Sequence, residues 1–279
     1  MTTLEVLTAA TEYLGKQGVE SPRLNAEHLL AHVLGKAKRI ELYLDFERPL
    51  GEKERGPLRE LVRQRAAGIP LQHLLGTVEF LGHTFACDAR GLIARPETEQ
   101  LAELVLRLVP APTFRALDVG TGSGVLALSL ALARPEASVC ACDISPDALA
   151  LARENAARHE LSSRVNFLES DLLSAVEGTF DLIVANLPYI PSGEIPGLSR
   201  EVRNDPLLAL DGGPDGLRLV ERLAADTPRV LAPGGLLALE IGIDQAGPVK
   251  NLLEAENYRD IAGFPDYQGI ERFITARHG

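Results

Sequence analysis

The sequence is poor in cysteine, has no long apolar run and begins without a leader-like segment. Its 279 residues include three cysteines, at positions 87, 140 and 142, which are too few to suggest a disulfide framework. No apolar stretch approaches the ~20 residues that a transmembrane helix requires. The first five residues, MTTLE, lack the basic start and apolar stretch of a secretory signal peptide. We therefore expect a cytoplasmic protein that is not associated with a membrane.

The sequence also lacks an excess of positive charge. Its formal net charge is −11 at pH 7. Residues 1–75 hold 11 of the 28 Lys and Arg and 10 of the 39 Asp and Glu, so this segment carries +1 and the remainder carries −12. An acidic body repels the phosphates of nucleic acids. The charge distribution therefore argues against a nucleic-acid substrate, although it does not exclude a local basic patch.

The spacing of apolar residues divides the chain. Residues 3–75 show helical spacing only, with a helix start expected at Ser21-Pro22, and residues 78–85 have the pattern of a β-hairpin. From residue 92 onward strands and helices alternate, which is typical of βαβ units around a parallel sheet covered on both faces. The expected strands cover 116–119, 138–142, 165–168, 180–185, 236–241 and 271–276. The expected helices of this part cover 98–108, 124–133, 146–158, 215–231 and 246–255.

Histidines and cysteines do not form a convincing metal or redox motif. His28 and His32 have the i, i+4 spacing of a helical metal pair, but the sequence around them is not H-E-x-x-H. Cys140 and Cys142 fall within one expected strand, where successive side chains point to opposite faces of the sheet. For cysteines within such a strand, buried apolar packing is the common role. We expect no metal site.

A glycine-rich turn follows the first strand expected after residue 92. The stretch 118–124, DVGTGSG, has glycine at alternate positions, and glycine lets the backbone turn tightly and approach a ligand closely. The next helix directs its free N–H groups to the same place. A dinucleotide fingerprint requires G-x-G-x-x-G, but Val125 stands at the sixth position. The G-x-G-x-G form with Asp118 resembles motif I of Rossmann-like S-adenosylmethionine methyltransferases. A nicotinamide-dependent enzyme and a glycine turn without ligand are the alternatives.

Acidic residues end the next two strands. Asp143 ends the second, where a carboxylate can accept hydrogen bonds from both ribose hydroxyls, and Asp171 follows the third. In methyltransferases of this kind the position of Asp171 lies beside the adenine. The resemblance implies that S-adenosyl-L-methionine is held by Gly120, Thr121, Gly122, Ser123, Gly124, Asp143, Asp171 and Leu172, with Asn186 at the border of the site.

The fourth strand ends in Asn186-Leu187-Pro188-Tyr189. The lone pair of an amide or aromatic amine is delocalised, so such a nitrogen is a poor nucleophile. The Asn186 side-chain oxygen can accept one of its N–H groups and the Leu187 carbonyl the other. Pro188 restricts residue 187 to extended geometry, and the Tyr189 ring can stack on a planar substrate. The tetrapeptide resembles the [Asn/Asp]-Pro-Pro-Tyr motif of methyltransferases that act on planar NH₂ groups. A strand-ending turn without chemistry is the alternative.

Further stretches resemble one family, the protein-(glutamine) methyltransferases that modify peptide chain release factors. These stretches are LQHLLG at 71–76, LIARPETE at 92–99, the segment 201–217, EIG at 240–242 and the segment 269–273. The resemblance covers nearly the whole chain. It implies an α/β fold with a helical substrate-recognition domain (1–75), a β-hairpin connector (76–91) and a Rossmann-like, seven-stranded methyltransferase domain (92–279).

The resemblance also implies a reaction and a partner. The expected activity is methylation of the side-chain amide nitrogen N5 of the glutamine in the Gly-Gly-Gln loop of release factors. Asn186 and the Leu187 carbonyl would hold the glutamine amide. The methionine end of the cofactor site would be lined by Arg95, Pro96 and Thr98.

One residue departs from the family pattern, which usually has proline where this chain has Leu187. Because only the carbonyl of this residue is used, leucine can replace proline with some loss of rigidity. The four residues also resemble the motif of ribosomal RNA adenine dimethylases. Adenine N6-amino methylation of RNA and a non-catalytic module that binds translation factors are therefore the alternatives. The segment 201–217 and the acidic body favour a protein substrate. The sequence does not indicate the preferred release factor, the oligomeric state or whether the connector hinges.

Overall fold

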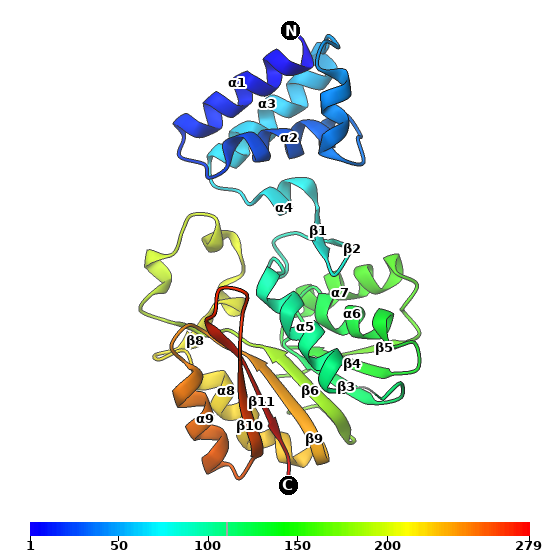
Figure 1. Cartoon of the computed structure of the whole chain (residues 1–279), viewed down its shortest axis with the longest axis vertical. Helices are drawn as coiled ribbons and strands as arrows, with labels where there is room; N and C mark the ends of the chain where they lie inside the picture. The colour runs from blue at the N-terminus through cyan, green and yellow to red at the C-terminus, as the bar shows by residue number, and fades with distance from the viewer. Residues whose placement is uncertain (110) are drawn as a thin grey trace. The chain divides into compact units, whose positions relative to one another are not determined.

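The computed structural model describes residues 1–109 and 111–279, and these residues form two compact units. The helical unit consists of Met1–Thr77 and Ser199–Asn204. The sheet unit consists of Val78–Leu198 and Asp205–Gly279. Figure 1 labels the α-helices and most strands of each unit. In the described part of the chain, no helix is long and apolar enough to cross a membrane.

The helical unit packs its helices around a separate apolar core. Its elements are α1 (Thr3–Lys16), α2 (Pro22–Val33), η1 (Arg39–Asp45), α3 (Glu52–Ala66) and α4 (Leu71–Leu75). Helix α1 begins with a capping box, in which the Thr2 hydroxyl accepts the Glu5 N–H at 3.2 Å and the Glu5 carboxylate accepts the Thr2 N–H at 2.9 Å. Helix α2 begins at Pro22 as expected. Ser21 does not cap it, because its backbone is left-handed, with φ at 47°, and its side chain makes no capping hydrogen bond.

Buried polar groups attach Ser199–Asn204 to the helices. The Arg65 guanidinium donates to Asn25 Oδ1 at 2.7 Å, to the Ile69 carbonyl at 3.1 Å and to Glu201 Oε2 at 2.7 Å. The Arg65 side chain is only 7% exposed, whereas that of Glu201 is 41% exposed, so water shields this pair from one side only. This part of the long segment after strand β6 therefore belongs to the helical unit.

A seven-stranded, mostly parallel sheet forms the centre of the sheet unit within the described ranges, which confirms the predicted fold class. Its spatial order is β10-β11-β9-β6-β3-β4-β5. The strands are β3 (Arg115–Val119), β4 (Ser138–Asp143), β5 (Val165–Glu169), β6 (Phe180–Asn186), β9 (Leu231–Glu240), β10 (Arg259–Pro265) and β11 (Glu271–Arg277). Strands β5, β4, β3, β6 and β9 are parallel, β11 pairs antiparallel with β9, and β10 pairs antiparallel with β11. The direction of winding changes between β3 and β6. Such a switch point opens a crevice at the carboxyl ends of the strands.

Helices cover both faces of the sheet (Figure 1). The helices of the sheet unit are α5 (Pro96–Leu108), α6 (Val125–Ala133), α7 (Pro146–Arg158), α8 (Arg218–Asp226) and α9 (Ala246–Ala255). Alternate residues of β6 enter different cores: Leu182 and Val184 pack with α5 and α6, whereas Ile183 and Ala185 pack with α8 and α9. The short elements are β7 (Ile190–Pro191), η2 (Ile195–Gly197), η3 (Val202–Asn204), η4 (Leu207–Ala209), β8 (Asp211–Gly213) and η5 (Thr227–Arg229).

The sequence does not predict the edge strand β10. All of its residues are exposed or half-buried, and its pairing with β11 is irregular at two places. Such a strand has no buried run and no strict alternation, which are the patterns that identify strands in a sequence. It forms because β11 offers an edge with free backbone groups.

The hairpin of β1 (Thr77–Phe80) and β2 (His83–Ala86) forms as predicted. Phe80 and Phe85 are fully buried and meet edge to face, with ring centroids 6.4 Å apart. The side chain of Asn155 on α7 accepts the Ala86 N–H at 2.6 Å and donates to the Ala86 carbonyl at 3.1 Å. The side chain therefore acts as a partner strand for the end of β2 and holds the hairpin against the sheet unit.

Candidate functional site

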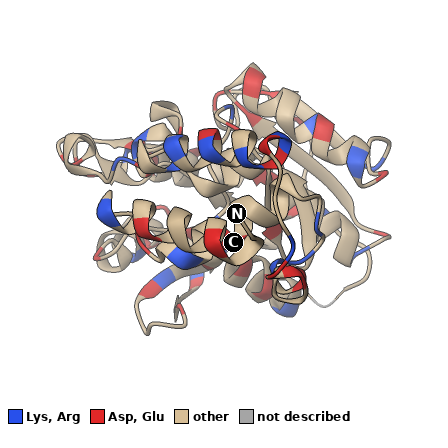
Figure 2. Cartoon of the chain, turned by 90° about the horizontal axis from the view of Figure 1, so that it is seen from above, with Lys and Arg blue, Asp and Glu red and all other residues tan. Residues whose placement is uncertain are grey.

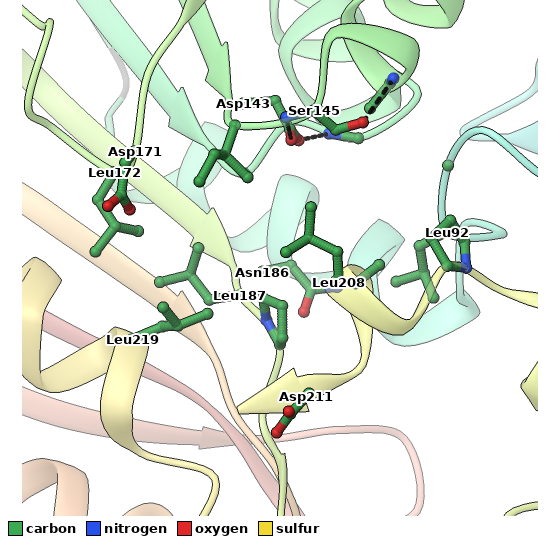
Figure 3. A pocket seen from close by; sticks show the side chains of 18 of the residues that line it. Leu92, Asp143, Ser145, Asp171, Leu172, Asn186, Leu187, Leu208, Asp211 and Leu219 are labelled. Carbon is green, nitrogen blue, oxygen red and sulfur yellow. Dashed lines mark hydrogen bonds between the residues drawn. The ribbon is translucent and has the colours of Figure 1, made fainter. Parts of the chain in front are cut away.

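A cavity of about 300 Å³ lies at the carboxyl ends of β3, β4, β5 and β6. Figure 3 shows Asn186 and Leu187 side by side on its wall, with Asp171 and Leu172 on one side of them and Leu92 on the other. The residues expected at the site that line this cavity are Gly120, Gly122, Asp143, Asp171, Leu172, Asn186, Leu187 and Pro188. The sequence did not suggest the lining residues contributed by the segment before α5 and by the segment after β7, which include Gly91, Leu92, Pro206 and Leu208.

The carboxylate of Asp118 on β3 holds the glycine turn that follows this strand. This carboxylate is 2% exposed and accepts hydrogen bonds from the Thr121 hydroxyl at 2.6 Å and the Ala127 N–H at 3.1 Å. Burial raises the pKa of Asp118 to about 7, although both hydrogen bonds act in the opposite direction. Thr121 and Ser123 are themselves buried and do not line the cavity. Asp118 and Thr121 therefore shape the turn rather than bind a ligand.

The three glycines of the turn are required for two different reasons. All have positive φ, at 74°, 57° and 82° for Gly120, Gly122 and Gly124. A Cβ on Gly120 would lie 2.9 Å from Leu187 Cδ2, and one on Gly124 would lie 3.0 Å from Ala152 Cβ. At Gly122 a Cβ would meet nothing within 4 Å. Gly120 and Gly124 therefore allow close packing inside the protein, and Gly122 presents bare backbone to the open space of the cavity.

Asp143 ends β4 and orients its carboxylate at the cavity. Its Oδ2 accepts the Gly122 N–H at 2.8 Å and its Oδ1 accepts the Ser145 N–H at 2.9 Å (Figure 3). Burial raises its pKa, while the backbone hydrogen bonds lower it. A carboxylate has about four acceptor positions, so two remain for a ligand. This geometry suits a vicinal diol.

The corner after β5 has a strained backbone and an ion pair. Leu172 has φ at 49°, and its carbonyl accepts the Ser170 hydroxyl at 2.8 Å. Asp171 pairs with Arg222 of α8 at 2.8 Å, and both side chains are nearly half exposed. Left-handed conformations of non-glycine residues persist where the surroundings enforce them. The corner is thus a preformed wall of the cavity, with Leu172 as its apolar surface.

The carboxamide of Asn186 is fixed by two residues distant in sequence. Its Nδ2 donates to the Thr98 hydroxyl at 3.0 Å, and this hydroxyl donates to Glu240 Oε2 at 2.8 Å. Thr98 lies in the first turn of α5 and is buried, so it supports Asn186 and does not line the cavity. Asn186 and Glu240 are direct neighbours on β6 and β9. With Nδ2 engaged, Asn186 Oδ1 is the group available as an acceptor.

The three residues after Asn186 are held by different means. The Leu187 side chain is 3% exposed and packs on Gly120, and in the described structure its carbonyl accepts no hydrogen bond. The Tyr189 carbonyl accepts from Gln245 Nε2 at 3.0 Å, and its hydroxyl accepts from Arg272 Nη2 at 3.0 Å. The Arg272 guanidinium also lies 5.2 Å from the centre of the Tyr189 ring. Tyr189 is therefore held by Gln245 and Arg272 and does not line the cavity, and the Leu187 carbonyl is free to accept a hydrogen bond.

Arg95 and Pro96 lie outside the cavity lining. Pro96 opens α5, and Arg95 precedes it with extended backbone. The Arg95 guanidinium pairs with the buried carboxylate of Asp205, which also accepts the Ile93 N–H at 3.3 Å. Because Asp205 directly precedes the cavity residues Pro206 and Leu208, this pairing anchors their segment to the start of α5.

The sequence left four polar residues of this region without a role: Asp205, Glu240, Gln245 and Arg272. The sequence could have pointed to Glu240, because a carboxylate directly follows the apolar run Leu236–Leu239 at the end of a buried strand. The partners could not be foreseen, since they lie on α5, β6 and β11. Across the described residues, no group of His, Cys, Asp and Glu has an arrangement suited to a metal ion.

Two of the three arginines that line the cavity are paired with carboxylates. Arg90 bonds to both Asp88 and Glu154 at 2.7 Å, and Arg222 bonds to Asp171. Acidic and basic residues are likewise intermixed along the helices (Figure 2). Surface pairs of this kind contribute little to stability. Their effect here is to neutralise Arg90 and Arg222, whereas Arg218 donates only to the Asp211 carbonyl, at 3.4 Å.

Comparison with known proteins agrees with this geometry. Residues 5–76 match the family profile "PrmC N-terminal domain", and residues 86–195 match "Methyltransferase small domain". A methyltransferase structure from Pyrococcus furiosus, 21% identical, superposes on the chain with a TM-score of 0.56, covering 71% of this chain and 90% of its own. At this identity the likeness concerns the fold alone.

Curated relatives match over almost their entire length. The release factor glutamine methyltransferase of Moorella thermoacetica is 45% identical over 99% of this chain and 98% of its own. The protein of the same name from Deinococcus radiodurans is 44% identical over 98% of this chain and 97% of its own. The resemblance inferred from the motifs is therefore confirmed, and the chain belongs to the release factor glutamine methyltransferase family.

Proposed function

We propose that this protein transfers a methyl group from S-adenosyl-L-methionine to the side-chain amide nitrogen N5 of the glutamine in the Gly-Gly-Gln loop of peptide chain release factors. The observation that carries the proposal is the pair of acceptors at the end of β6. Asn186 and Leu187 both line the cavity, and the Asn186 amide group donates to the Thr98 hydroxyl, which leaves its oxygen as the acceptor. A primary amide has two N–H donors, and these two acceptors match them.

The residues of the cavity fit S-adenosyl-L-methionine. Gly122 offers bare backbone to open space, Asp143 keeps free acceptor positions for a ribose diol, and Leu172 offers an apolar surface for a purine. The volume of about 300 Å³ lies at the lower end of the range for small-molecule sites. When bound, this group supplies an electrophilic methyl on a sulfonium. Their place in the cavity lining supports a binding role for Gly120, Gly122, Asp143, Asp171 and Leu172, whereas Arg95 pairs with Asp205 and Thr98 accepts from Asn186 outside that lining.

The acceptors act on the reacting nitrogen by holding it. Two hydrogen bonds to the glutamine NH₂ fix its position and favour pyramidal geometry, which localises the lone pair. Holding the nitrogen in line with the methyl and its leaving sulfur is the main source of rate acceleration in such a site. A general base is not needed, because alkylation makes the amide nitrogen strongly acidic and its proton is then lost to water.

The charges of the sheet unit favour a protein loop over RNA. Two of the three arginines that line the cavity, Arg90 and Arg222, are each paired with carboxylates, and the third, Arg218, donates to the Asp211 carbonyl at 3.4 Å. Nucleic-acid binding requires free Lys and Arg along a backbone path. We assign recognition of the release factor outside its glutamine to the predicted helical domain, residues 1–75, together with Ser199–Asn204, which belongs to the same compact unit. We place the reaction in the cytoplasm. The hairpin 76–91 connects the helical region to the methyltransferase domain 92–279.

The test is methyl transfer from labelled S-adenosyl-L-methionine to purified release factor or to total RNA. We expect label in the release factor, located by mass spectrometry on the glutamine of the Gly-Gly-Gln tryptic peptide. Label in RNA alone would reject the proposal in favour of adenine methylation. Label in neither, with retained binding of release factor, would indicate a non-catalytic binding module.

A matched pair of variants tests the role of Asn186. Asn186→Ala should lower kcat by about 100-fold or more, the effect of removing one preorganised group from a transition-state site, with little change in cofactor affinity. The control is Asn166→Ala, the same change on the exposed side of β5 away from the cavity lining. Near-normal turnover of Asn186→Ala would contradict the assigned role.

A further inference from the structure

A chain of hydrogen bonds leads from a buried carboxylate to the catalytic asparagine. Glu240 lies at the end of β9 and is 1% exposed. Its Oε2 accepts the Thr98 hydroxyl at 2.8 Å, and the Thr98 oxygen accepts Asn186 Nδ2 at 3.0 Å. We propose that Glu240 is a positioning residue, whose carboxylate acts through Thr98 to hold the Asn186 carboxamide with its oxygen towards the cavity. This inference rests on the proposed function.

The direction of the chain follows from counting protons. An ionised carboxylate can only accept hydrogen bonds, so the single proton of the Thr98 hydroxyl is committed to Glu240. The Thr98 oxygen must then accept from its other neighbour. Only the NH₂ end of the Asn186 carboxamide can donate. The oxygen of Asn186 therefore turns to the other side, where the substrate NH₂ requires an acceptor.

The neutral form of Glu240 removes this constraint. A protonated carboxyl can donate to Thr98, whose proton is then free to be donated to Asn186 Oδ1. The carboxamide can then rotate and present its NH₂ group to the cavity. Two NH₂ groups would face each other there, and the substrate nitrogen would lose one of its two acceptors.

The surroundings hold the Glu240 charge only weakly. Among the described residues, Glu240 Oε1 has no hydrogen-bond partner, and neither has Arg272 Nε. Burial raises the pKa of Glu240 to about 7, while the Thr98 hydroxyl, the positive charge of Arg272 and the Asn186 amide lower it and Glu97 raises it. The Tyr189 ring packs on the same arginine. A buried charge with so little compensation is unfavourable for folding, which points to a role in the site.

Kinetics of three variants test the inference. Glu240→Gln keeps the shape of the side chain, but the new NH₂ group can donate to the Thr98 hydroxyl. The direction of the hydrogen bonds from Asn186 through Thr98 is then no longer fixed. We expect kcat for release factor to fall about tenfold or more, the effect of losing one hydrogen bond to a buried polar group, with a cofactor Kd within about threefold of the wild type. Thr98→Val should show a similar loss, whereas Thr98→Ser, which keeps the hydroxyl, should restore most activity.

The pH profile and a double variant separate positioning from simple structural support. Wild-type kcat should decline as the pH falls through about 7, the pKa of Glu240, and this decline should be absent in Glu240→Gln. Asp118 titrates in the same range but is unchanged in this variant, so the difference between the profiles isolates Glu240. The double variant Thr98→Val/Glu240→Gln should be no slower than the slower single variant, because both act through one chain. Wild-type kcat and pH profile in Glu240→Gln, or additive losses in the double variant, would overturn the inference.

A readout without substrate keeps this inference separate from the proposed function. In protein labelled with ¹⁵N-asparagine, the side-chain NH₂ signals of Asn186 can be assigned by comparison with Asn186→Asp. We expect them to shift with pH near 7 in the wild type and to remain constant in Glu240→Gln. If the wild type does not methylate release factor but this shift occurs, the proposed substrate is wrong and the positioning role stands. Signals that do not respond to pH in the wild type reject the positioning role.

Discussion

Titration of Glu240 should make the sheet unit less stable as the pH rises. The folded protein holds the Glu240 proton up to about pH 7, whereas an exposed glutamate loses it at its ordinary value of 4.5. Between these values the unfolded chain binds fewer protons than the folded chain, so raising the pH favours unfolding. The separation of the two pKa values corresponds to a loss of about 3 kcal/mol in the free energy of unfolding. Most of it, about 2.5 kcal/mol, falls between pH 5 and pH 8.

The perturbation that isolates this effect is Glu240→Gln, which cannot titrate. The free energy of unfolding of this variant, relative to the wild type, should increase by about 2.5 kcal/mol from pH 5 to pH 8. Other carboxyl groups titrate equally in both proteins, so they cancel in the difference. A variant that is less active and yet more stable at pH 8 is the combination expected of a strained functional group.

The assay is urea unfolding at several pH values, followed by circular dichroism because the sequence has no tryptophan. All three cysteines, at positions 87, 140 and 142, lie in the sheet unit. A short pulse of thiol reagent during unfolding therefore identifies the transition of that unit. A difference between the two proteins that stays constant from pH 5 to pH 8 would refute the reasoning, since it would mean that Glu240 has an ordinary pKa.

Three further predictions concern other parts of the structure. Asp143→Ala should weaken cofactor binding by at least tenfold in calorimetry, because about two charge-assisted hydrogen bonds are lost; unchanged affinity would remove Asp143 from the site. Gly120→Ala should destabilise the sheet unit by about 1–3 kcal/mol, because φ at this position is positive and the new methyl group would clash with Leu187. The loss should be smaller in a Leu187→Ala background, and equal losses in both backgrounds would show that the clash is unimportant. Arg65→Ala should increase hydrogen exchange in residues 199–204, relative to wild type, and unchanged exchange would mean that the ion pair does not hold this segment.

Much of the fold could be predicted because its signals are local. The alternation of buried strands and helices, the glycine turn and the polar end of β6 are each contained in a few consecutive residues. The carboxyl ends of parallel strands share one edge, so Gly120, Asp143 and Asn186 were expected to meet there, and they line one cavity. Strand β10 was missed because an exposed edge strand carries no such periodicity.

The support of the site depended on contacts that no local pattern encodes. Thr98 was expected beside the cofactor, yet it lies behind Asn186 because α5, β6 and β9 bring residues 98, 186 and 240 together. In the same way, residues 199–204 join the helical unit through the buried Arg65. A sequence specifies which groups need hydrogen-bond partners, whereas the packing of distant elements selects the partners, because a buried donor or acceptor pairs with whatever the neighbouring element places within about 3 Å.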